Sequence, residues 1–301
     1  MANENERGQL KDYTRSIKIH QVIRVIICII LTVIALLPIY FIVINATRSH
    51  DSILKSGIAF APSGNFVENF KLLKDPNAAN GIYVNSFDLW IGYRNSLFVA
   101  GASTILSVFF SGATAYGISV YDFKFKKAAR TIILAVMMIP TQVVSVGLLN
   151  FMIKLGLTNN YLPLILPAIA APATVFFMLQ YMQSSFPVDI VEAARIDGSG
   201  EFRTFIQIAV PMLKPAFAVQ AIFAFVTNWN NFYTPSVLLT NGKLDMMTMP
   251  MMVATVLGIK RSVNYGVNYL VVTLSVLPVV IVYLCLSKFI VRGVALGAVK
   301  G

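Results

Sequence analysis

Long apolar stretches separated by shorter polar segments dominate this chain. Six stretches are long enough, and free enough of charge, to cross a bilayer as helices, because one span needs about 20 mostly apolar residues. They lie near residues 25–44, 96–121, 129–153, 161–183, 215–235 and 270–287. The fifth is the most polar, since its C-terminal half contains Asn228, Trp229, Asn230 and Asn231. The pattern predicts an all-α, multi-pass membrane protein with six transmembrane helices.

Composition agrees with a membrane protein. Of the 301 residues, 57% are hydrophobic and only 12% are charged, whereas about 25% of the residues in a soluble domain are charged. The net charge of +11 could indicate nucleic-acid binding. However, the basic residues are scattered between the apolar stretches and form no single basic face, so we interpret them as signals of membrane orientation.

The distribution of lysine and arginine predicts which segments face the cytoplasm. With an internal N-terminus, the inside segments are 1–24, 122–130, 184–214 and 288–301, and they hold 15 of the 24 basic residues. The outside segments are longer in total and hold nine. Cytoplasmic loops are enriched in lysine and arginine in this way. We therefore expect cytoplasmic termini, with a basic segment over 1–24, a transmembrane domain over 25–290, a cytoplasmic loop over 184–214 and a tail over 291–301.

Two outside segments, 45–94 and 236–269, are too long to be simple turns. We expect the first to pack into a small cap. The second is rich in methionine around Pro250 and predicts a short helix near the outer surface. Methionine suits either an adaptable surface for a partner or a packed re-entrant helix. The methionines are Met246, Met247, Met249, Met251 and Met252.

The cytoplasmic loop 184–214 has the pattern of two short helices. Pro187 suits the first turn of a helix, and Gly198 is a natural stop because glycine tolerates the left-handed conformation. A second helical stretch is expected over about 201–209. Glu192 and Arg195 would offer charges to a partner. The predicted first helix has one mostly small or apolar face, formed at i, i+3, i+4 and i+7 spacing by Ile190, Ala193, Ala194 and Asp197.

A known signature is visible in this loop. Glu192, Ala193 and Ala194 are followed after three residues by Gly198, and after nine more by Ile208-Ala209-Val210-Pro211. This spacing resembles the signature of the membrane subunits of ATP-binding-cassette (ABC) importers, with Val210 where leucine is usual. The residues around the motif resemble the carbohydrate-uptake branch. The C-terminal residues 293–301 resemble the tail of the maltose-type second permease subunit.

The resemblance implies a mechanism and a set of partners. Residues 188–197 would form a coupling helix in a groove of a cytoplasmic ATPase, where Glu192 meets a basic residue, and Gly198 would set the bend. The partners implied are a second homologous permease subunit, two ATPase subunits, an extracytoplasmic solute-binding protein and a carbohydrate substrate, in a prokaryotic cell membrane. Other residues implied at the coupling contact are Ala193, Ala194, Arg195 and Asp197. The implied tail contacts between the two ATPase subunits are Gly297, Lys300 and Gly301.

Several kinds of chemistry are missing from the sequence. It has no Gly-x4-Gly-Lys-Ser/Thr phosphate loop, no His-Glu-x2-His zinc helix and no Gly-x-Ser-x-Gly nucleophile motif. Within the six predicted spans, the only charged residue is Arg130 at an edge, whereas ion-coupled transporters usually hold an ionisable group in the membrane. We expect no catalytic site, metal or cofactor in this chain, with ATP and Mg bound by the partner ATPase. An importer subunit for amino acids or polyamines, a secondary transporter and a membrane enzyme remain alternatives.

A neutral, hydroxyl-rich solute would need amide, hydroxyl and aromatic side chains along its path. Such side chains can instead form hydrogen bonds between helices, each worth about 0.6 kcal/mol on average. Residues 258–266 resemble, by position, an outer loop that probes the solute-binding protein in maltose-type subunits. The candidates for the substrate path are Gln142, Gln180, Asn228, Trp229, Asn230, Asn231 and Tyr233.

Overall fold

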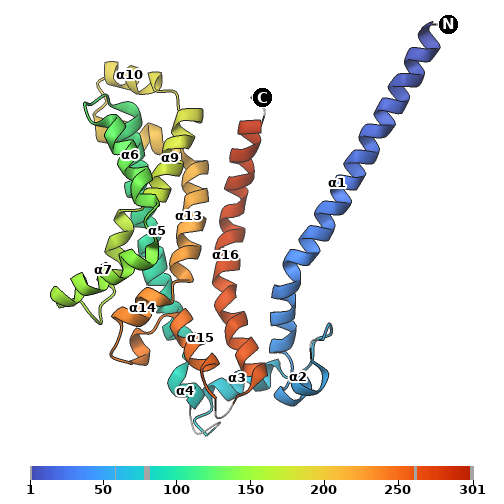
Figure 1. Cartoon of the computed structure of the whole chain (residues 1–301), viewed down its shortest axis with the longest axis vertical. Coiled ribbons are helices and arrows are strands. Elements are labelled where there is room, and N and C mark those ends of the chain that lie inside the picture. The colour runs from blue at the N-terminus through green and yellow to red at the C-terminus, as the bar shows by residue number, and fades with distance from the viewer. Residues whose placement is uncertain (1, 58, 78–81, 261–262, 299–301) are drawn as a thin grey trace. The chain divides into compact units, whose positions relative to one another are not determined.

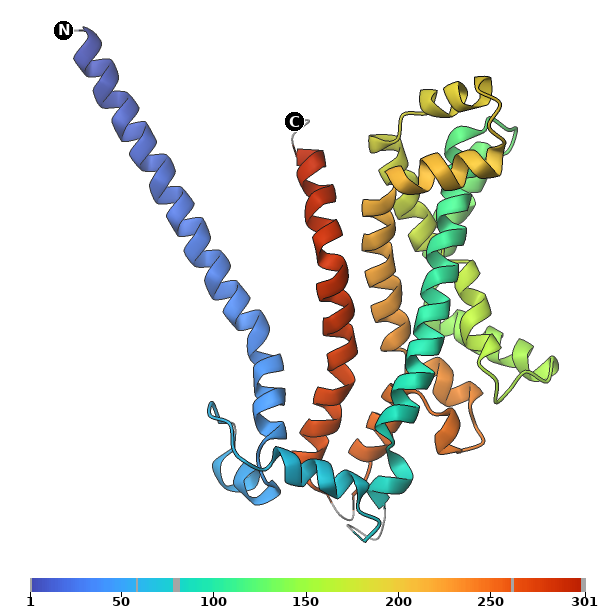
Figure 2. The same ribbon diagram turned by 180° about the vertical axis from the view of Figure 1, so that it is seen from behind.

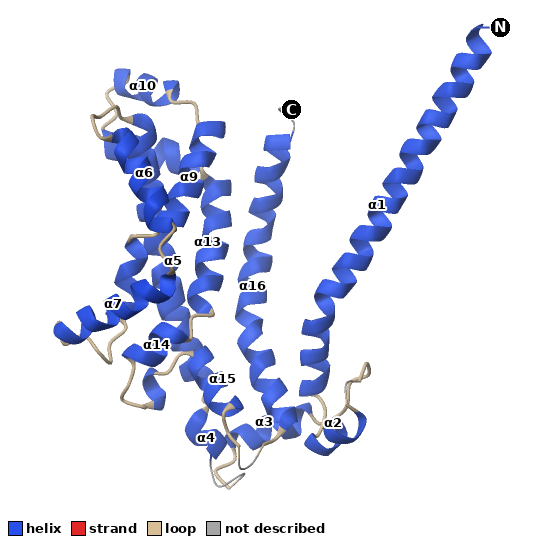
Figure 3. Cartoon of the chain, viewed as in Figure 1, coloured by secondary structure: helices blue, strands red, loops and turns tan. Residues whose placement is uncertain are grey.

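The structure is a computed structural model, and all regular structure in its described part is helical (Figure 3). The backbone is described for residues 2–57, 59–77, 82–260 and 263–298, and the side chains for 18–57, 59–77, 82–140, 143–260 and 263–287. The all-α prediction is therefore confirmed for these residues. The chain divides into two compact units: residues 1–72 with 263–273, and residues 73–262 with 274–301.

The first unit contains a long apolar helix and an ordered cap. Its elements are α1 (Ala2–Ala46), α2 (His50–Ser56), most of α3 (Phe66–Lys74) and the start of α16 (Tyr265–Ala298). Arg48 is only 3% exposed, and its guanidinium donates to the backbone oxygen of Ser52 at 2.7 Å and to Asn45 Oδ1 at 2.9 Å. A Cβ atom on Gly266 would clash with the Arg48 carbonyl oxygen, so only glycine fits there. The start of the predicted outer segment is thus a tightly hydrogen-bonded cap.

The second unit is built around α5 (Leu89–Val120). This helix packs against α9 (Pro172–Ser185) and α13 (Lys214–Trp229), and α6 (Lys126–Met137) packs on α9 (Figures 1 and 2). With 32 residues, α5 is about 48 Å long, more than the roughly 30 Å of a bilayer's hydrocarbon core. Small buried residues let the neighbouring helices approach closely. They include Ser103, Ser107, Ser111, Gly112 and Ala115.

Four helical segments among the described residues are long and apolar enough to cross a membrane: Lys18–Ala46, Ile82–Val120, Leu162–Ser185 and Tyr265–Ser287. They correspond to the first, second, fourth and sixth predicted spans. The fourth is composite, because α8 (Leu162–Ile165) and the 3₁₀ helix η2 (Leu166–Ile169) precede α9.

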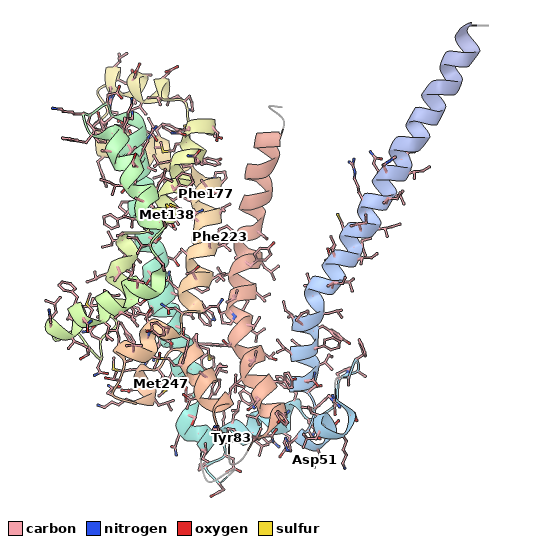
Figure 4. All side chains as sticks on the ribbon, viewed as in Figure 1. Asp51, Tyr83, Met138, Phe177, Phe223 and Met247 are labelled. Atoms are coloured by element: carbon pink, nitrogen blue, oxygen red, sulfur yellow. The ribbon has the colours of Figure 1, made fainter. Side chains whose placement is uncertain are left out.

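The prediction of one continuous helix over 129–153 is wrong. Helix α6 ends at Met137, and α7 (Thr141–Lys154) begins only after Pro140. Proline has no backbone N–H to donate, and it disfavours helical geometry in the residue before it. Met138, at the break, lies partway along the bundle (Figure 4), and α7 turns away from the direction of α5 (Figures 1 and 2).

The fifth predicted span is shorter and more bent than expected. Helix α13 ends at Trp229, inside the asparagine-rich cluster, and α14 (Tyr233–Leu238) follows as a separate helix. At its other end, α13 meets the helical segment Glu201–Met212 at 81°. If this bent pair counts as one span, the described residues contain up to five. Hydropathy located the apolar stretch, but the local polar residues ended the helix early.

The other end of the second unit is closed by short helices. Here α4 (Ile82–Ser86), α14 and α15 (Met249–Leu257) lie opposite α10 (Asp189–Ile196), with Tyr83 and Met247 among them (Figures 1 and 4). The 3₁₀ helix η4 (Leu244–Met246) precedes α15. Met249 and Met252 are fully buried, and the Met249 N–H donates to Ser96 Oγ of α5 at 2.7 Å. The predicted methionine-rich helix is confirmed, and its methionines are packed core residues within this chain.

Candidate functional site

The loop 184–214 forms a compact cluster of short helices at one end of the second unit (Figures 1 and 2). It contains α10 (Asp189–Ile196), α11 (Glu201–Thr204), a π-helical turn η3 (Phe205–Ala209) and α12 (Val210–Met212). The two predicted helical stretches are confirmed. The bend between them is at Gly198, whose φ of +77° is in the left-handed region that glycine adopts without steric cost.

The underside of this loop is part of the hydrophobic core of the bundle. Val191 and Ala209 are fully buried, and Phe205 is 5% exposed. They join one cluster with Tyr116 of α5 and Met178 of α9, and the Phe205 and Tyr116 ring centroids are 5.2 Å apart. Burying a side chain such as Phe205 contributes about 2 kcal/mol. The buried face of the loop is therefore packed against α5 and α9.

The face of α10 that the sequence pattern singled out is mostly exposed, and only Ala194 of its four residues is buried. Val191 and Ala194 point into the bundle, whereas Ile190, Ala193 and Asp197 are exposed. The i, i+3, i+4 pattern finds candidate faces of a helix, but it cannot tell which face meets the rest of the protein.

The outer surface of the loop combines exposed apolar and charged residues. Ile196 is 87% exposed and Phe202 is 72% exposed, one on each side of the bend. Glu192 is also exposed. Large apolar groups with charges around them are typical of the centre of a protein interface. Sequence reasoning missed Ile196 and Phe202, although both are bulky apolar residues within a polar loop.

Arg195 braces the loop from within. Its Nε donates to Glu201 Oε1 at 2.8 Å and its Nη2 to Glu201 Oε2 at 3.3 Å. The Tyr121 hydroxyl, at the end of α5, donates to the same carboxylate, and the Arg195 guanidinium carbon lies 5.4 Å from the centre of the Tyr121 ring. The hydrogen bond from Arg195 lowers the pKa of Glu201. Arg195, predicted to offer its charge to a partner, is thus paired with Glu201 of the same chain.

Trp229 and two of the asparagines from the predicted substrate path are already occupied by contacts within this chain. Trp229 is 1% exposed, its Nε1 donates to the Ser275 carbonyl oxygen of α16 at 3.0 Å, and its ring stacks on Phe225 with centroids 5.7 Å apart. Asn228 Nδ2 donates to the Ala224 carbonyl oxygen at 2.8 Å. Asn231 Oδ1 accepts from the backbone N–H of Thr234 at 3.2 Å. Only the contact of Trp229 joins two helices, as the alternative interpretation expects, whereas those of Asn228 and Asn231 are local.

Other predicted path residues are exposed but not together. Asn230 and Tyr233 follow the end of α13 that is farther from α12. Gln180 is exposed on α9, about 8 Å along the helix from the end that leads to α10. Within the part of the chain that the structure describes, no three His, Cys, Asp or Glu side chains come together as a metal site.

Some predicted site residues cannot be placed. Gln142 lies in α7, but its side chain is outside the described residues. Gly297 lies in the last turns of α16, which continues to Ala298, and Lys300 and Gly301 are outside the described residues.

Comparisons with known proteins agree with this arrangement. A family described as binding-protein-dependent transport system inner membrane component matches residues 107–296, which include the whole loop 184–214. The arabinooligosaccharides transport system permease protein AraQ of Halalkalibacterium halodurans is 33% identical over 89% of this chain and 92% of its own length. The trehalose/maltose transport system permease protein MalG of Thermococcus litoralis is 28% identical over 93% and 97%, respectively.

A solved structure shows the same fold. A chain from the crystal structure of a bacterial ABC transporter involved in the import of the acidic polysaccharide alginate superposes with a TM-score of 0.73. The match covers 91% of this chain and 97% of that one, at 21% sequence identity.

Proposed function

Because the chain belongs to the family of binding-protein-dependent transport system inner membrane components, we propose that it forms half of the translocation pathway of an ATP-driven importer for a sugar or oligosaccharide. The relatives named for arabinooligosaccharides and for trehalose and maltose support this substrate class. The chain itself would have no catalytic role, since its sequence lacks a phosphate-binding loop. ATP and Mg would be bound by a separate ATPase subunit.

The proposal rests on a contrast within the loop 184–214, whose exposed tip is attached to residues that are buried in the bundle. Glu192, Ile196 and Phe202 are exposed, whereas Val191 and Phe205 are packed into the bundle. An ATPase that pushes on the exposed side chains would therefore move α5 and α9 as one body. Such rigid-body transfer is a common way to switch between two arrangements of a helix bundle.

We propose that Glu192 and its neighbours sit in a groove of the ATPase. Ala193 and Asp197 would lie at the contact, while Ala194, Arg195 and Gly198 would hold the shape of the loop. The complex would contain a second homologous permease subunit, two ATPase subunits and an extracytoplasmic solute-binding protein. The tail, with Gly297, Lys300 and Gly301, would reach between the two ATPase subunits.

The proposed topology has six crossings and cytoplasmic termini. Helices α6 and α7 have 12 and 14 residues, or about 18 and 21 Å, so neither spans a hydrocarbon core of roughly 30 Å alone. Together, α6 and α7 would make the third crossing. The second and third crossings would then meet in the cytoplasm at the basic segment 122–130, which supports this orientation.

For the substrate path, Asn230 and Tyr233 are the best-placed candidates because they are exposed. Trp229 and the two bonded asparagines would shape the wall behind them, with Gln142 and Gln180 at other depths. Residues 258–266 would face the solute-binding protein. Deleting that loop should abolish uptake stimulated by the binding protein while the ATPase stays attached; unchanged uptake would refute this role.

The orientation can be tested by thiol labelling in intact cells. Cys28 and Cys285 are first replaced by alanine, and a single cysteine is introduced as Glu192→Cys or, for the outside, Lys243→Cys; both sites are exposed. An impermeant reagent should label Lys243→Cys directly, but Glu192→Cys only after permeabilisation. Labelling of Glu192→Cys in intact cells would overturn the proposed function.

Attachment of the ATPase provides the second test. Ile196→Asp should reduce co-purification of the ATPase, because a charge would replace an apolar contact. Leu54→Asp is the matched control, since Leu54 is 60% exposed in the outer cap. If both variants retain the ATPase equally, the exposed tip is not its docking site.

A further inference from the structure

The corner between α5 and α6 carries exposed aromatic and basic side chains side by side. Phe123 is 43% exposed and Phe125 is 68% exposed. Lys124 and Lys127 are also exposed. Large apolar groups are costly in water, so an exposed pair beside free charges indicates that something covers this surface.

Of the three lysines at this corner, only Lys126 has an acidic partner among the described residues. Its Nζ lies 3.0 Å from Asp122 Oδ1 and 3.4 Å from the Ser119 carbonyl oxygen. Lys124 and Lys127 form no ion pair with any described residue, and α6 contains no acidic residue. Arg130 has a buried Nε with no hydrogen-bond partner in the described part of the chain. The corner thus presents a net positive surface.

The position of the basic residues along α6 indicates the partner. One to three turns beyond Lys127, Ile132 is 60% exposed, Leu134 is 46% exposed and Val136 is 41% exposed. Lys127 is about 7.5 Å from Ile132 along the helix, similar to the thickness of one headgroup layer. Apolar residues next to lipid tails, followed by aromatic and basic residues, are typical of a membrane interface.

We propose that Phe123, Lys124, Phe125 and Lys127 bind anionic phospholipid headgroups of the inner leaflet. The phenylalanine rings would enter the interface while the two ammonium groups contact phosphate oxygens. The ATPase is a poorer occupant of this corner. The tip proposed to receive it exposes acidic residues, Asp189, Glu192 and Asp197, so the matching ATPase surface would be basic and would repel these lysines. The assignment of this site to the inner leaflet rests on the proposed topology, but the binding of anionic headgroups does not.

Lipid binding here would anchor the corner that also holds the cytoplasmic loop. Tyr121 donates to Glu201 of that loop and lies two residues before Phe123. Binding at residues 123–127 would thus keep this corner, and the loop joined to it, at the membrane surface while α5 and α10 move together.

The test uses the full chain with its co-purifying subunits in nanodiscs, where both leaflets are accessible. Phe125→Trp serves as a fluorescent probe, and the parent protein supplies the background from Trp90 and Trp229. Brominated phosphatidylglycerol should quench the probe more strongly than brominated phosphatidylcholine at the same mole fraction. Lys124→Gln with Lys127→Gln should weaken this preference about 25-fold, or about fivefold for each charge.

The matched control is Lys243→Gln with Lys260→Gln, which removes two exposed lysines elsewhere in the second unit and should leave the preference unchanged. Equal quenching by the two lipids would refute recognition of the headgroup. Absence of quenching by either lipid, or quenching only after the ATPase is removed, would show that water or a protein covers the corner and would overturn the proposal. None of these results depends on whether the complex transports a sugar.

Discussion

Arg195 and Glu201 join two short helices across the bend at Gly198, with Arg195 Nε 2.8 Å from Glu201 Oε1. The Tyr121 hydroxyl donates to the same carboxylate, so the end of α5 is included in the contact. This three-residue brace lies beside the surface that we propose receives the ATPase. Its effect would be to keep α10 and α5 moving together.

Loss of the brace should uncouple ATP hydrolysis from transport. Arg195→Gln is expected to lower the number of sugar molecules imported per ATP by less than about fivefold, because exposed ion pairs contribute modestly. Uptake and ATP turnover are measured together in proteoliposomes. The double exchange Arg195→Glu with Glu201→Arg should recover part of the ratio. If the single and double variants behave alike, the ion pair has no role in coupling.

The brace should also make stability depend on pH. The Arg195 hydrogen bond lowers the pKa of Glu201 below its ordinary value of 4.5. A carboxylate with a lowered pKa in the folded state adds stability that is complete above its ordinary pKa and is lost as pH falls through the lowered one. The melting temperature of the parent should therefore exceed that of Glu201→Gln at pH 7, and the difference should shrink below pH 4.5. A difference that stays constant between pH 7 and about pH 4 would contradict a contribution of the Arg195–Glu201 pair to stability.

Reversing the charge of Glu192 should release the ATPase. The side chain is exposed on α10, so Glu192→Lys should fold normally but place a like charge against the proposed basic partner. We expect co-purification to weaken by about tenfold or more. Glu68→Lys, on α3 of the outer cap and also exposed, is the control for a general charge effect. Equal retention in both variants would contradict the docking role of Glu192.

Gly198 and Gly200 provide a matched test of the bend. A Cβ atom on either residue would meet no other atom within 4 Å, but Gly198 has φ +77° and Gly200 has φ −69°. Gly198→Val should destabilise the loop by about 1–2 kcal/mol, because an L-residue is strained in the left-handed region. Gly200→Val should have little effect. Thermal unfolding and ATPase attachment measure both, and equal behaviour would refute a bend that depends on φ.

Trp229 and Asn230 should separate packing from substrate contact. Trp229→Phe removes the hydrogen bond to the Ser275 carbonyl oxygen and should lower stability by about 1 kcal/mol. Asn230→Ala changes an exposed side chain, so it should leave the melting temperature unchanged while raising the sugar concentration needed for half-maximal uptake. Unchanged uptake by Asn230→Ala would remove this residue from the path.

Hydropathy alone predicts most of the membrane helices, since burying about 20 apolar residues in lipid is a local property of a sequence. The bend at Gly198 is predictable for a similar reason, because the conformations open to glycine belong to that residue itself. The break at Pro140 was missed although the proline is visible in the sequence. The sequence stays apolar on both sides of Pro140. Hydropathy indicates that a segment prefers an apolar environment, but it does not show whether the backbone hydrogen bonds of the helix are continuous.

The contacts that hold the loop needed the folded chain. A repeat of apolar positions shows that α10 has distinct faces, but only packing against α5 and α9 turns Val191 inward and Ala193 outward. Tyr121 and Glu201 are 80 residues apart, and no local pattern pairs them. Their contact exists because the bundle brings the end of α5 to the start of α11, where long-range packing sets which side chains meet.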